Sequence, residues 1–298
     1  MPTVSIVLFT RNRKEELLTA LESCFAQDHR PLEVLVFDDA STDGTEEAVR
    51  TSFPEVRFFR EESNRGIAAL RNRGFQEARG ELVFSIDDDA YYTDPSTIRC
   101  VVEQFRREPE AAVIAMPFVE PLRQGCVATT LNTSDRLRAF ISCAYAIRRA
   151  TALELGGYRE FFFYRGEERD LSIRLLDRGF RIVYGQSPPV VHLYSPKRAW
   201  SQMFPLGIRN NLLFDSLNIP HPYVLPRLAL DAVQLFLYKL TITQVFSRMA
   251  FILRGFLACV KYASLRDPVS KETYRLYRTL PNHGPASAPA PTPGPARR

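Results

Sequence analysis

Strand-like and helix-like segments alternate over the first third of the chain, and this alternation constrains the fold more than any other feature. Each strand is short and apolar, and most are followed within a few positions by a segment with helical spacing of apolar residues. Short connections between alternating strands and helices are typical of a parallel, doubly wound sheet. The expected strands are residues 4–9, 32–37, 56–59 and 82–86, and the expected helices are 14–25, 46–51, 66–78 and 95–107.

Polar clusters directly follow three of these strands. Because the carboxyl ends of parallel strands meet at one edge of a sheet, where ligands bind, we expect the clusters to share one crevice. Three consecutive carboxylates are either a solvated acidic turn or a site for a divalent ion, since Mg²⁺ and Mn²⁺ prefer carboxylate oxygens. The convergence favours a site. The clusters are Thr10, Arg11, Asn12 and Arg13, then residues 38–45, and then Asp87, Asp88 and Asp89.

A second group of carboxylates precedes the helix expected at residues 170–178. Glu167, Glu168 and Asp170 follow an aromatic run and a glycine. Acids at a helix N-terminus are stabilising in themselves, by roughly 0.3–1 kcal/mol each. Carboxylates behind an aromatic cluster can equally have the raised pKa that a general base working near neutral pH requires. Further strands are expected at 111–118, 181–184 and 190–192, and a loop or hairpin at 125–135.

His192 ends the last expected strand and has two interpretations. It is either a metal ligand or a hydrogen-bonded core histidine, and for a single histidine the core interpretation is favoured.

Composition excludes several classes of protein. A hydrophobic content of 45% and a charged content of 24% are those of an ordinary globular protein. Neither a signal-peptide pattern nor a run of 18 apolar residues occurs, so we expect no leader and no membrane span. The five cysteines are widely spaced and never form a CxxC pair, which argues against a disulfide framework or a zinc site and favours a reduced cytoplasm.

Basic charge is concentrated near the C-terminus. Residues 223–278 hold nine Lys or Arg against three Asp or Glu, whereas the whole chain has a net charge of +5. Residues 223–264 read as amphipathic helices that either contact a membrane surface or pack on the preceding domain or on another copy of it. Six prolines in residues 281–298 predict a disordered tail. The expected division is therefore a domain at 1–215, a helical region at 216–280 and a tail at 281–298.

Several motifs in order resemble the family 2 glycosyltransferases over roughly residues 3 to 215. The resemblance implies an α/β fold of the GT-A type, a Rossmann-like and mostly parallel sheet that binds a nucleotide-diphospho-sugar, with the helical region as a C-terminal extension. The matching segments are Thr10-Arg11-Asn12, residues 37–45 (FDDASTDGT), Asn64-Arg65-Gly66 with Arg71-Asn72, Asp87-Asp88-Asp89 at the DXD position, Glu167-Glu168-Arg169-Asp170-Leu171, and His192. Arg11 replaces the usual aromatic residue of the first motif.

The resemblance also implies residue roles. Asp39 accepts a hydrogen bond from the nucleotide base, the first motif lines that pocket, and Arg71 approaches the diphosphate. The family's catalytic base is the Asp of an ED pair. Glu168 stands at that position, and because its side chain is one methylene longer, the resemblance implies either Glu168 or Glu167 as the base. The implied nucleotide-sugar-binding residues are Thr10, Arg11, Asn12, Asp39, Arg71, Asp87 and Asp88, the catalytic ones are Glu168, Glu167 and Asp170, and the ligands of Mn²⁺ or Mg²⁺ are Asp89, Asp87 and His192.

The implied activity is inverting, metal-dependent transfer of a hexosyl or deoxyhexosyl group to a hydroxyl acceptor. A lipid-linked glycan in bacterial surface-polysaccharide or glycolipid assembly fits as acceptor, with the enzyme on the inner face of the cell membrane. The alternative is a nucleotide-sugar-binding protein without transfer activity. A nucleotidyltransferase lacks support because no glycine follows the first strand, and a processive synthase because no QxxRW motif occurs. Nucleic acid is a poor fit because the basic excess lies on apolar helices.

Overall fold

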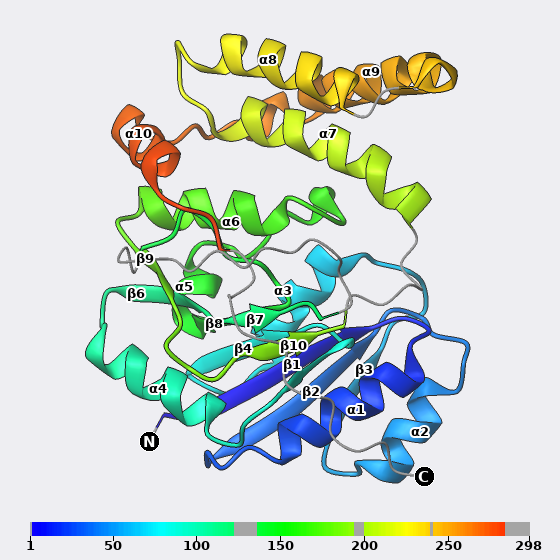
Figure 1. Cartoon of the computed structure of the whole chain (residues 1–298), viewed down its shortest axis with the longest axis vertical. Helices are drawn as coiled ribbons and strands as arrows, with labels where there is room; N and C mark the ends of the chain where they lie inside the picture. Colours follow the sequence, from blue (N-terminus) through cyan, green and yellow to red (C-terminus); the bar gives the residue numbers. More distant parts are fainter. Residues whose placement is uncertain (1, 122–135, 194–199, 239–240, 284–298) are drawn as a thin grey trace.

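The computed structural model describes residues 2–121, 136–193, 200–238 and 241–283. Within these ranges a central sheet of seven strands has the order β3-β2-β1-β4-β8-β6-β9 (Figure 1). Only β8 runs antiparallel to its neighbours, so the expected mostly parallel sheet is confirmed. The strands are β1 (Val4–Thr10), β2 (Leu32–Asp38), β3 (Arg57–Arg60), β4 (Leu82–Ile86), β6 (Ala111–Ala115), β8 (Ala144–Arg148) and β9 (Arg181–Tyr184).

Helices cover both faces of the sheet, and each face has its own hydrophobic core. Side chains of β1 alternate between the cores, because successive side chains of a strand point to opposite faces. Ile6 and Leu8 pack with Leu17 of α1, whereas Phe9 packs with Phe75 of α3. One face carries α1 (Lys14–Phe25), α2 (Thr45–Ser52) and α4 (Thr97–Arg107), and the other carries α3 (Ile67–Glu77), α5 (Arg149–Glu154) and α6 (Glu167–Asp177).

A small second sheet, β5-β10-β7, adjoins the acidic triplet. The sequence predicted one strand over residues 111–118, but that segment divides into β6 and β7 (Phe118–Val119), which belong to different sheets. β5 (Ala90–Tyr92) follows the triplet directly and pairs antiparallel with β10 (Val190–His192). Because Ala90 lies opposite His192 in this register, a residue distant in sequence is brought beside Asp89.

Two further expectations were wrong in detail. The antiparallel strand β8 was not predicted, because its alanines carry little strand propensity. Helix α6 begins at Glu167 rather than Asp170, so that Glu167 and Glu168 occupy its first turn. Gly166, with φ +88°, forms the preceding left-handed turn that glycine adopts without steric cost.

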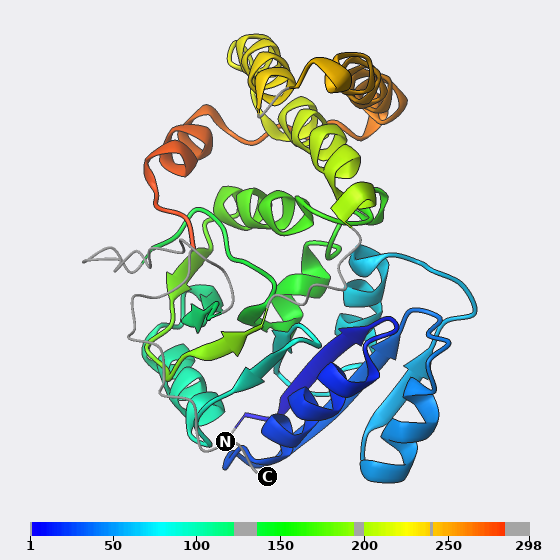
Figure 2. The same cartoon turned by 45° about the vertical axis from the view of Figure 1, so that its right-hand side comes forward.

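Helices make up the rest of the described chain. Figures 1 and 2 show α7 over α6, with α8 and α9 side by side beyond α7 at one end of the molecule. The proposed division at residue 215 falls inside α7 and stays a prediction. No helix in the described ranges is long and apolar enough to span a membrane. The helices are α7 (Trp200–Asn218), α8 (Val224–Leu237), α9 (Val245–Lys261) and α10 (Lys271–Thr279).

The first residues of the expected tail are ordered. His283 is buried; the Ile141 N–H donates to its Nδ1 (3.1 Å), and its Nε2 lies 2.9 Å from the Met116 carbonyl oxygen. The tail was therefore predicted to begin too early, since composition alone does not report this docking. Residues 284–298, and the loop or hairpin expected at 125–135, lie outside the described ranges.

Candidate active site

Two adjoining pockets lie at the carboxyl ends of β1, β2 and β4. The first, of about 430 Å³, contains Asp39 and is called the Asp39 pocket below. The second, of about 370 Å³, contains both Glu168 and Asp87 and is called the Glu168 pocket. Their shared walls make one continuous cleft, as the convergence of polar strand ends predicted. The shared residues are Phe9, Arg13, Ile67, Tyr164 and Met203.

The Asp39 pocket holds the first predicted motif. Thr10, Arg11 and Asn12 line it together with Asp39. The N–H of Arg65 donates to Asp39 Oδ1 (2.7 Å), which fixes the orientation of the carboxylate. Burial raises the pKa of Asp39, and the two N–H groups of Arg65 and Gly66 partly oppose that increase. This anchored carboxylate is an acceptor for donor groups of a ligand.

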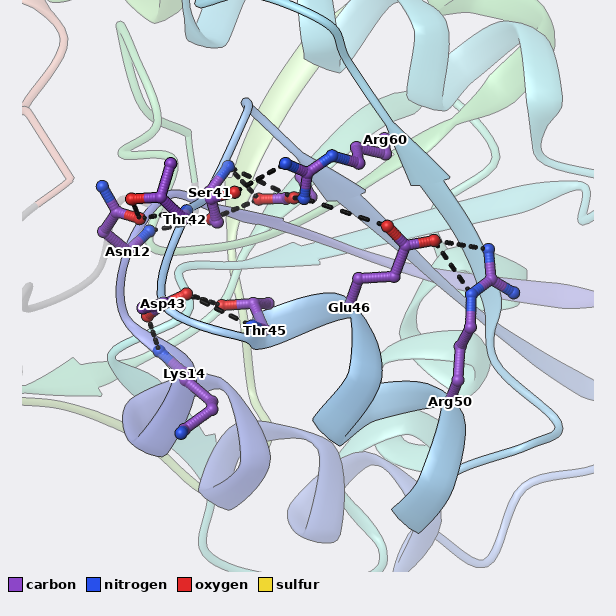
Figure 3. A network of polar contacts seen from close by, with 10 residues as sticks. Asn12, Lys14, Ser41, Thr42, Asp43, Thr45, Glu46, Arg50 and Arg60 are labelled. Carbon is purple, nitrogen blue, oxygen red and sulfur yellow. Dashed lines mark hydrogen bonds and ion pairs between the residues drawn. The ribbon is translucent and has the colours of Figure 1, made fainter.

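A polar network holds the loops after β1 and β2 together (Figure 3). Asn12 has φ +53°, and its Oδ1 accepts from the Thr42 N–H (2.7 Å). Asp43 accepts from the backbone N–H of Lys14 (3.1 Å) and of Thr45 (3.2 Å), at the starts of α1 and α2. Asn12 thus contributes to the pocket wall while its side chain joins two loops. The motif of residues 37–45 therefore joins two loops, while its Asp39 lines the pocket.

Asp87, Asp89 and His192 form the predicted metal group. One ligand atom from each lies within 4.8 Å of the others, and His192 Nε2 is 3.4 Å from Asp89 Oδ1 and 3.6 Å from Asp87 Oδ2. Two carboxylates and one imidazole suit Mn²⁺, and the carboxylates also suit Mg²⁺. The donor set therefore fits a divalent cation.

Glu120 orients the histidine of this group. Its Oε1 lies 2.9 Å from His192 Nδ1, so that Nε2 faces the aspartates. Burial lowers the pKa of His192, but hydrogen bonds to Asp89, Cys143 and Glu120 outweigh it and raise the pKa to about 12. The aspartate pair therefore attracts positive charge strongly, whether that charge is a proton or a metal ion.

Asp88 differs from its two neighbours in the triplet. It is fully buried, and Arg13 lies 3.0 Å from its Oδ1 and 3.3 Å from Asp89 Oδ2. Burial raises the pKa of Asp88 to about 7 despite Arg13, with Asp89 and Asp87 adding to the increase. Asp88 lines the Glu168 pocket, but its principal contact is this arginine.

Arg71 joins the two carboxylate groups that the sequence analysis treated separately. It is 3% exposed, and its guanidinium lies 2.7 Å from Glu167, 4.0 Å from Glu168 and 4.0 Å from Asp87. The ring of Tyr158 lies beneath it, at 5.6 Å from centroid to Cζ. One buried cation thus holds the acids of α6 and of the triplet in a common arrangement.

Glu167 and Glu168 have different environments. Glu167 is buried and paired with Arg71, and burial, followed by the charge of Glu168, raises the pKa of Glu167 to about 8. Glu168 is partly exposed at the pocket wall, where the hydroxyl of Ser142 donates to its Oε1 (2.7 Å). Of the pair, Glu168 is the carboxylate that a substrate in the pocket can reach.

Asp170 lies elsewhere. It is fully buried and does not line either pocket; Arg159 and Arg174 are each 3.0 Å from its carboxylate, and Asn218 donates to it at 2.9 Å. The predicted catalytic role of Asp170 therefore has no geometric support. The carboxylate joins α6 to α7 instead.

Sequence reasoning missed three residues that contact the site. Arg13 belongs to the polar cluster after the first strand, but the sequence assigned it no binding or catalytic role. Glu120 and Ser142 lie in segments that contain no motif. Neither hydrophobic periodicity nor residue spacing could have identified Glu120, because its partner His192 is 72 positions away.

Comparisons with known proteins point to glycosyltransferases. Residues 5–125 match the model of "Glycosyl transferase family 2". The O-antigen biosynthesis protein RfbC of Myxococcus xanthus is 25% identical over 226 residues, which are 66% of this chain and 18% of that protein. The succinoglycan biosynthesis protein ExoO of Rhizobium meliloti is 33% identical over 117 residues, or 39% of this chain and 33% of that protein. The chain thus matches a third or less of the length of these relatives.

A solved structure shares the fold. The mannosyltransferase PcManGT from Pyrobaculum calidifontis, in complex with GDP-Man and Mn²⁺, superposes with a TM-score of 0.61 at 21% identity, covering 93% of this chain and 79% of that one. The sheet and its cleft therefore define a glycosyltransferase fold of the GT-A type. Within that class, the match of residues 5–125 to the model of glycosyltransferase family 2 confirms the resemblance drawn from the motifs.

Proposed function

We propose that this chain is an inverting, metal-dependent glycosyltransferase that moves a sugar from a nucleotide-diphospho-sugar to a hydroxyl acceptor. One observation carries the proposal: a single cleft contains an anchored nucleotide-facing carboxylate, a candidate metal group and an accessible carboxylate on α6. A binding protein without transfer activity would need only the first two. The relative PcManGT binds GDP-Man, which supports a nucleotide-sugar donor here.

The donor occupies the cleft from one pocket to the other. The nucleotide base and ribose bind in the Asp39 pocket, beside Thr10 and Arg11. The diphosphate lies toward Asp87 and Arg71, and the sugar projects into the Glu168 pocket. The apolar walls of Phe9 and Ile67 between the pockets exclude water from the intervening bond.

Asp87, Asp89 and His192 would hold the divalent cation. When bound, the ion stabilises the negative charge that develops on the departing nucleoside diphosphate. The structure of PcManGT in complex with Mn²⁺ supports a divalent cation in this chain as well.

Glu168 is the general base. As the bond between the anomeric carbon and the diphosphate oxygen breaks, the acceptor oxygen attacks from the opposite face and its proton passes to Glu168. The anomeric configuration therefore inverts. Ser142 holds one carboxylate oxygen in place, and Arg71, 2.7 Å from Glu167 and 4.0 Å from Glu168, offsets negative charge on the pair.

The decisive experiment separates binding from turnover. In Glu168→Gln, nucleoside diphosphate release should fall by about 10²–10⁴, the usual contribution of a general base, because the amide cannot take the proton. Donor affinity, measured calorimetrically with Mn²⁺, should stay within a few-fold. Glu154→Gln, an exposed change on α5, is the matched control and should alter neither quantity. If affinity and turnover of Glu168→Gln fell together, the residue would be structural and the mechanism wrong.

We also assign the enzyme to bacterial surface-polysaccharide or glycolipid assembly, with hexosyl or deoxyhexosyl transfer in the cytoplasm. Relatives named for O-antigen and succinoglycan biosynthesis support this context. An acceptor attached to a lipid carrier would lie at a membrane, and the C-terminal helices provide a surface for membrane contact.

That surface is the outward side of α8 and α9, the α8–α9 face. It carries large apolar side chains that are well exposed, led by Phe246 (85%) and Val260 (76%). Two basic residues of α9, Arg254 and Lys261, are exposed, and α9 contains no acidic residue. An apolar stripe bordered by positive charge fits the interface of an anionic bilayer. The exposed apolar residues are Leu225, Leu230, Val233, Leu237, Tyr238, Phe246, Met249, Leu253, Phe256, Leu257 and Val260.

Liposome sedimentation tests the α8–α9 face. The protein should bind anionic vesicles at low salt, and the triple change Phe246→Ser, Leu253→Ser and Val260→Ser should weaken binding at least tenfold, since burial of each side chain contributes about 1.5–3 kcal/mol. Leu153→Ser removes an exposed leucine of α5 and is the control. A stable dimer with no vesicle binding would show that the face joins two copies instead.

A further inference from the structure

A third cavity, of about 620 Å³, lies behind the Glu168 pocket between α6, α7 and α10. Its size is within the range of small-molecule sites. Ile141 lines both this cavity and the Glu168 pocket, and the adjacent residue, Ser142, donates to Glu168. The cavity is therefore one residue removed from the proposed base. It is called the arginine cavity below, and its lining includes Arg138, Arg169, Arg227, Arg278, Tyr274 and Tyr277.

Two of the four arginines, Arg169 and Arg227, form ion pairs with carboxylates of the chain. Arg169 donates to Asn211 Oδ1 (2.7 Å) and lies 3.4 Å from Asp215, while Arg227 lies 2.6 Å from Asp231 and 3.8 Å from Asp215. These contacts join α6, α7 and α8. Their ion pairs account for both carboxylates that approach the arginines of this cavity among the described residues.

The other two arginines have no carboxylate within ion-pair distance in the described part of the chain. The Arg138 side chain hydrogen-bonds to Asn282 and lies 5.7 Å from the centroid of the Tyr277 ring. Arg278, on the last turn of α10, is exposed. Four arginines thus face two carboxylates, and the excess positive charge falls on Arg138 and Arg278.

Burial makes this excess larger. It raises the pKa of Asp215 to about 8 although Arg169 opposes the increase, so Asp215 carries less than a full negative charge near neutral pH. Phe214, Tyr274 and Tyr277 provide a mostly buried aromatic wall beside the charges. Guanidinium groups match the geometry of phosphate and carboxylate, and aromatic walls with a few placed polar groups are usual in ligand sites.

We infer that the arginine cavity binds the phosphate or carboxylate group of an anionic acceptor saccharide, through Arg138 and Arg278. The identification of the ligand as the acceptor rests on the proposed function, because the cavity adjoins Glu168, the carboxylate that would deprotonate the acceptor hydroxyl. The acceptor then extends from Glu168 past Ile141, with its reactive hydroxyl at one end and its anionic group at the other. Neutral saccharides lack the second contact.

Binding is tested first without any transfer reaction. Inorganic pyrophosphate is titrated by calorimetry in EDTA, where the acidic triplet, deprived of metal, repels anions. Wild-type protein should bind it with an affinity that falls as salt increases, and the double change Arg138→Gln and Arg278→Gln should weaken binding at least tenfold. Arg275→Gln, also on α10 but outside the cavity lining, should have no effect. Equal binding by the double variant, or none by the wild type, would overturn the inference.

Transfer to matched acceptors tests the second part. Glucuronate and glucose differ by a carboxylate, and glucose 1-phosphate and methyl glucoside differ by a phosphate, so the two pairs distinguish the two anions. One anionic member should accelerate nucleoside diphosphate release more than its neutral partner, and the double variant should lose that preference while retaining donor affinity. Equal stimulation by both members of both pairs would contradict the acceptor role. Failure of wild-type protein to turn over any donor would instead refute the proposed function, and pyrophosphate binding would still report on the cavity.

Discussion

Arg71 shows how one side chain organises the cleft at the scale of a residue. Its guanidinium is buried between acids from α6 and from the triplet, and loss of Glu167, 2.7 Å away, would leave this buried charge without its nearest partner. Breaking a buried pair of this kind typically costs 3–5 kcal/mol, which makes the arrangement rigid. The same rigidity preorganises a site in which negative charge must be stabilised during reaction.

Glu120 acts on the metal group through His192 and is a positioning residue. Glu120→Ala removes the hydrogen bond to Nδ1, which leaves the imidazole free to rotate away from Asp87 and Asp89. Mn²⁺ affinity should therefore fall by about 10- to 100-fold, the usual effect of losing such a partner. Electron paramagnetic resonance of free Mn²⁺ measures this directly.

The control for this prediction is Glu55→Ala, which removes an exposed carboxylate remote from the metal group. It should leave Mn²⁺ affinity unchanged. If Glu120→Ala bound Mn²⁺ as tightly as the wild type, the orientation of His192 would depend on other contacts.

At the scale of an element, the start of α3 depends on Gly66. Its φ of +81° disfavours any other residue, and an added Cβ would lie 2.4 Å from the ring of Phe163. The N–H of Gly66 also points toward Asp39. The glycine thus permits the close approach of the aromatic segment before α6 to the loop that anchors the Asp39 carboxylate.

Gly66→Ala should lower the free energy of unfolding by about 2–3 kcal/mol, since positive φ costs roughly 1–2 kcal/mol and the clash with Phe163 adds to it. Urea denaturation measures the loss. Gly156→Ala is the matched control: its φ is +72° but nothing lies within 4 Å of the added Cβ, so it should cost only the backbone contribution. Equal losses in the two variants would show that Phe163 moves aside freely.

At the scale of the whole molecule, His283 joins the C-terminal segment to the central sheet. It contacts the backbones of Met116 and Ile141, and its ring lies edge-on to Phe118 and Tyr184. Burial lowers the pKa of His283 to about 4, so the folded protein keeps this imidazole neutral. The contact links the end of the helical region to the wall of the cleft.

The pH dependence of stability follows from this shift. Between pH 6.5 and 4 the unfolded chain binds a proton at His283 that the folded chain does not, so this contribution to stability is present above pH 6.5 and is lost as pH falls. From pH 7 to pH 5 the loss should be about 2 kcal/mol. His283→Gln should remove that part of the slope in urea unfolding measured at several pH values. An unchanged slope would mean that the ring is solvated.

The order of strands and helices, and the positions of the carboxylates, were readable from the sequence, because both depend on short-range patterns. β4 was predicted at 82–86 and α1 at 14–25, and both have those bounds, since an apolar run or a helical repeat needs only its own residues. The acidic triplet at the end of β4 was a candidate site for the same reason.

Tertiary structure alone decided which of these residues meet. The ion pair of Arg71 with Glu167 spans 96 positions, and the pairing of β5 with β10 delivers His192 to Asp89 from a hundred residues away. The same contacts leave Glu168 accessible while turning Asp170 into a framework residue. No local pattern encodes such choices, because burial and pairing partners are set by how the layers pack and not by the spacing of residues along one element.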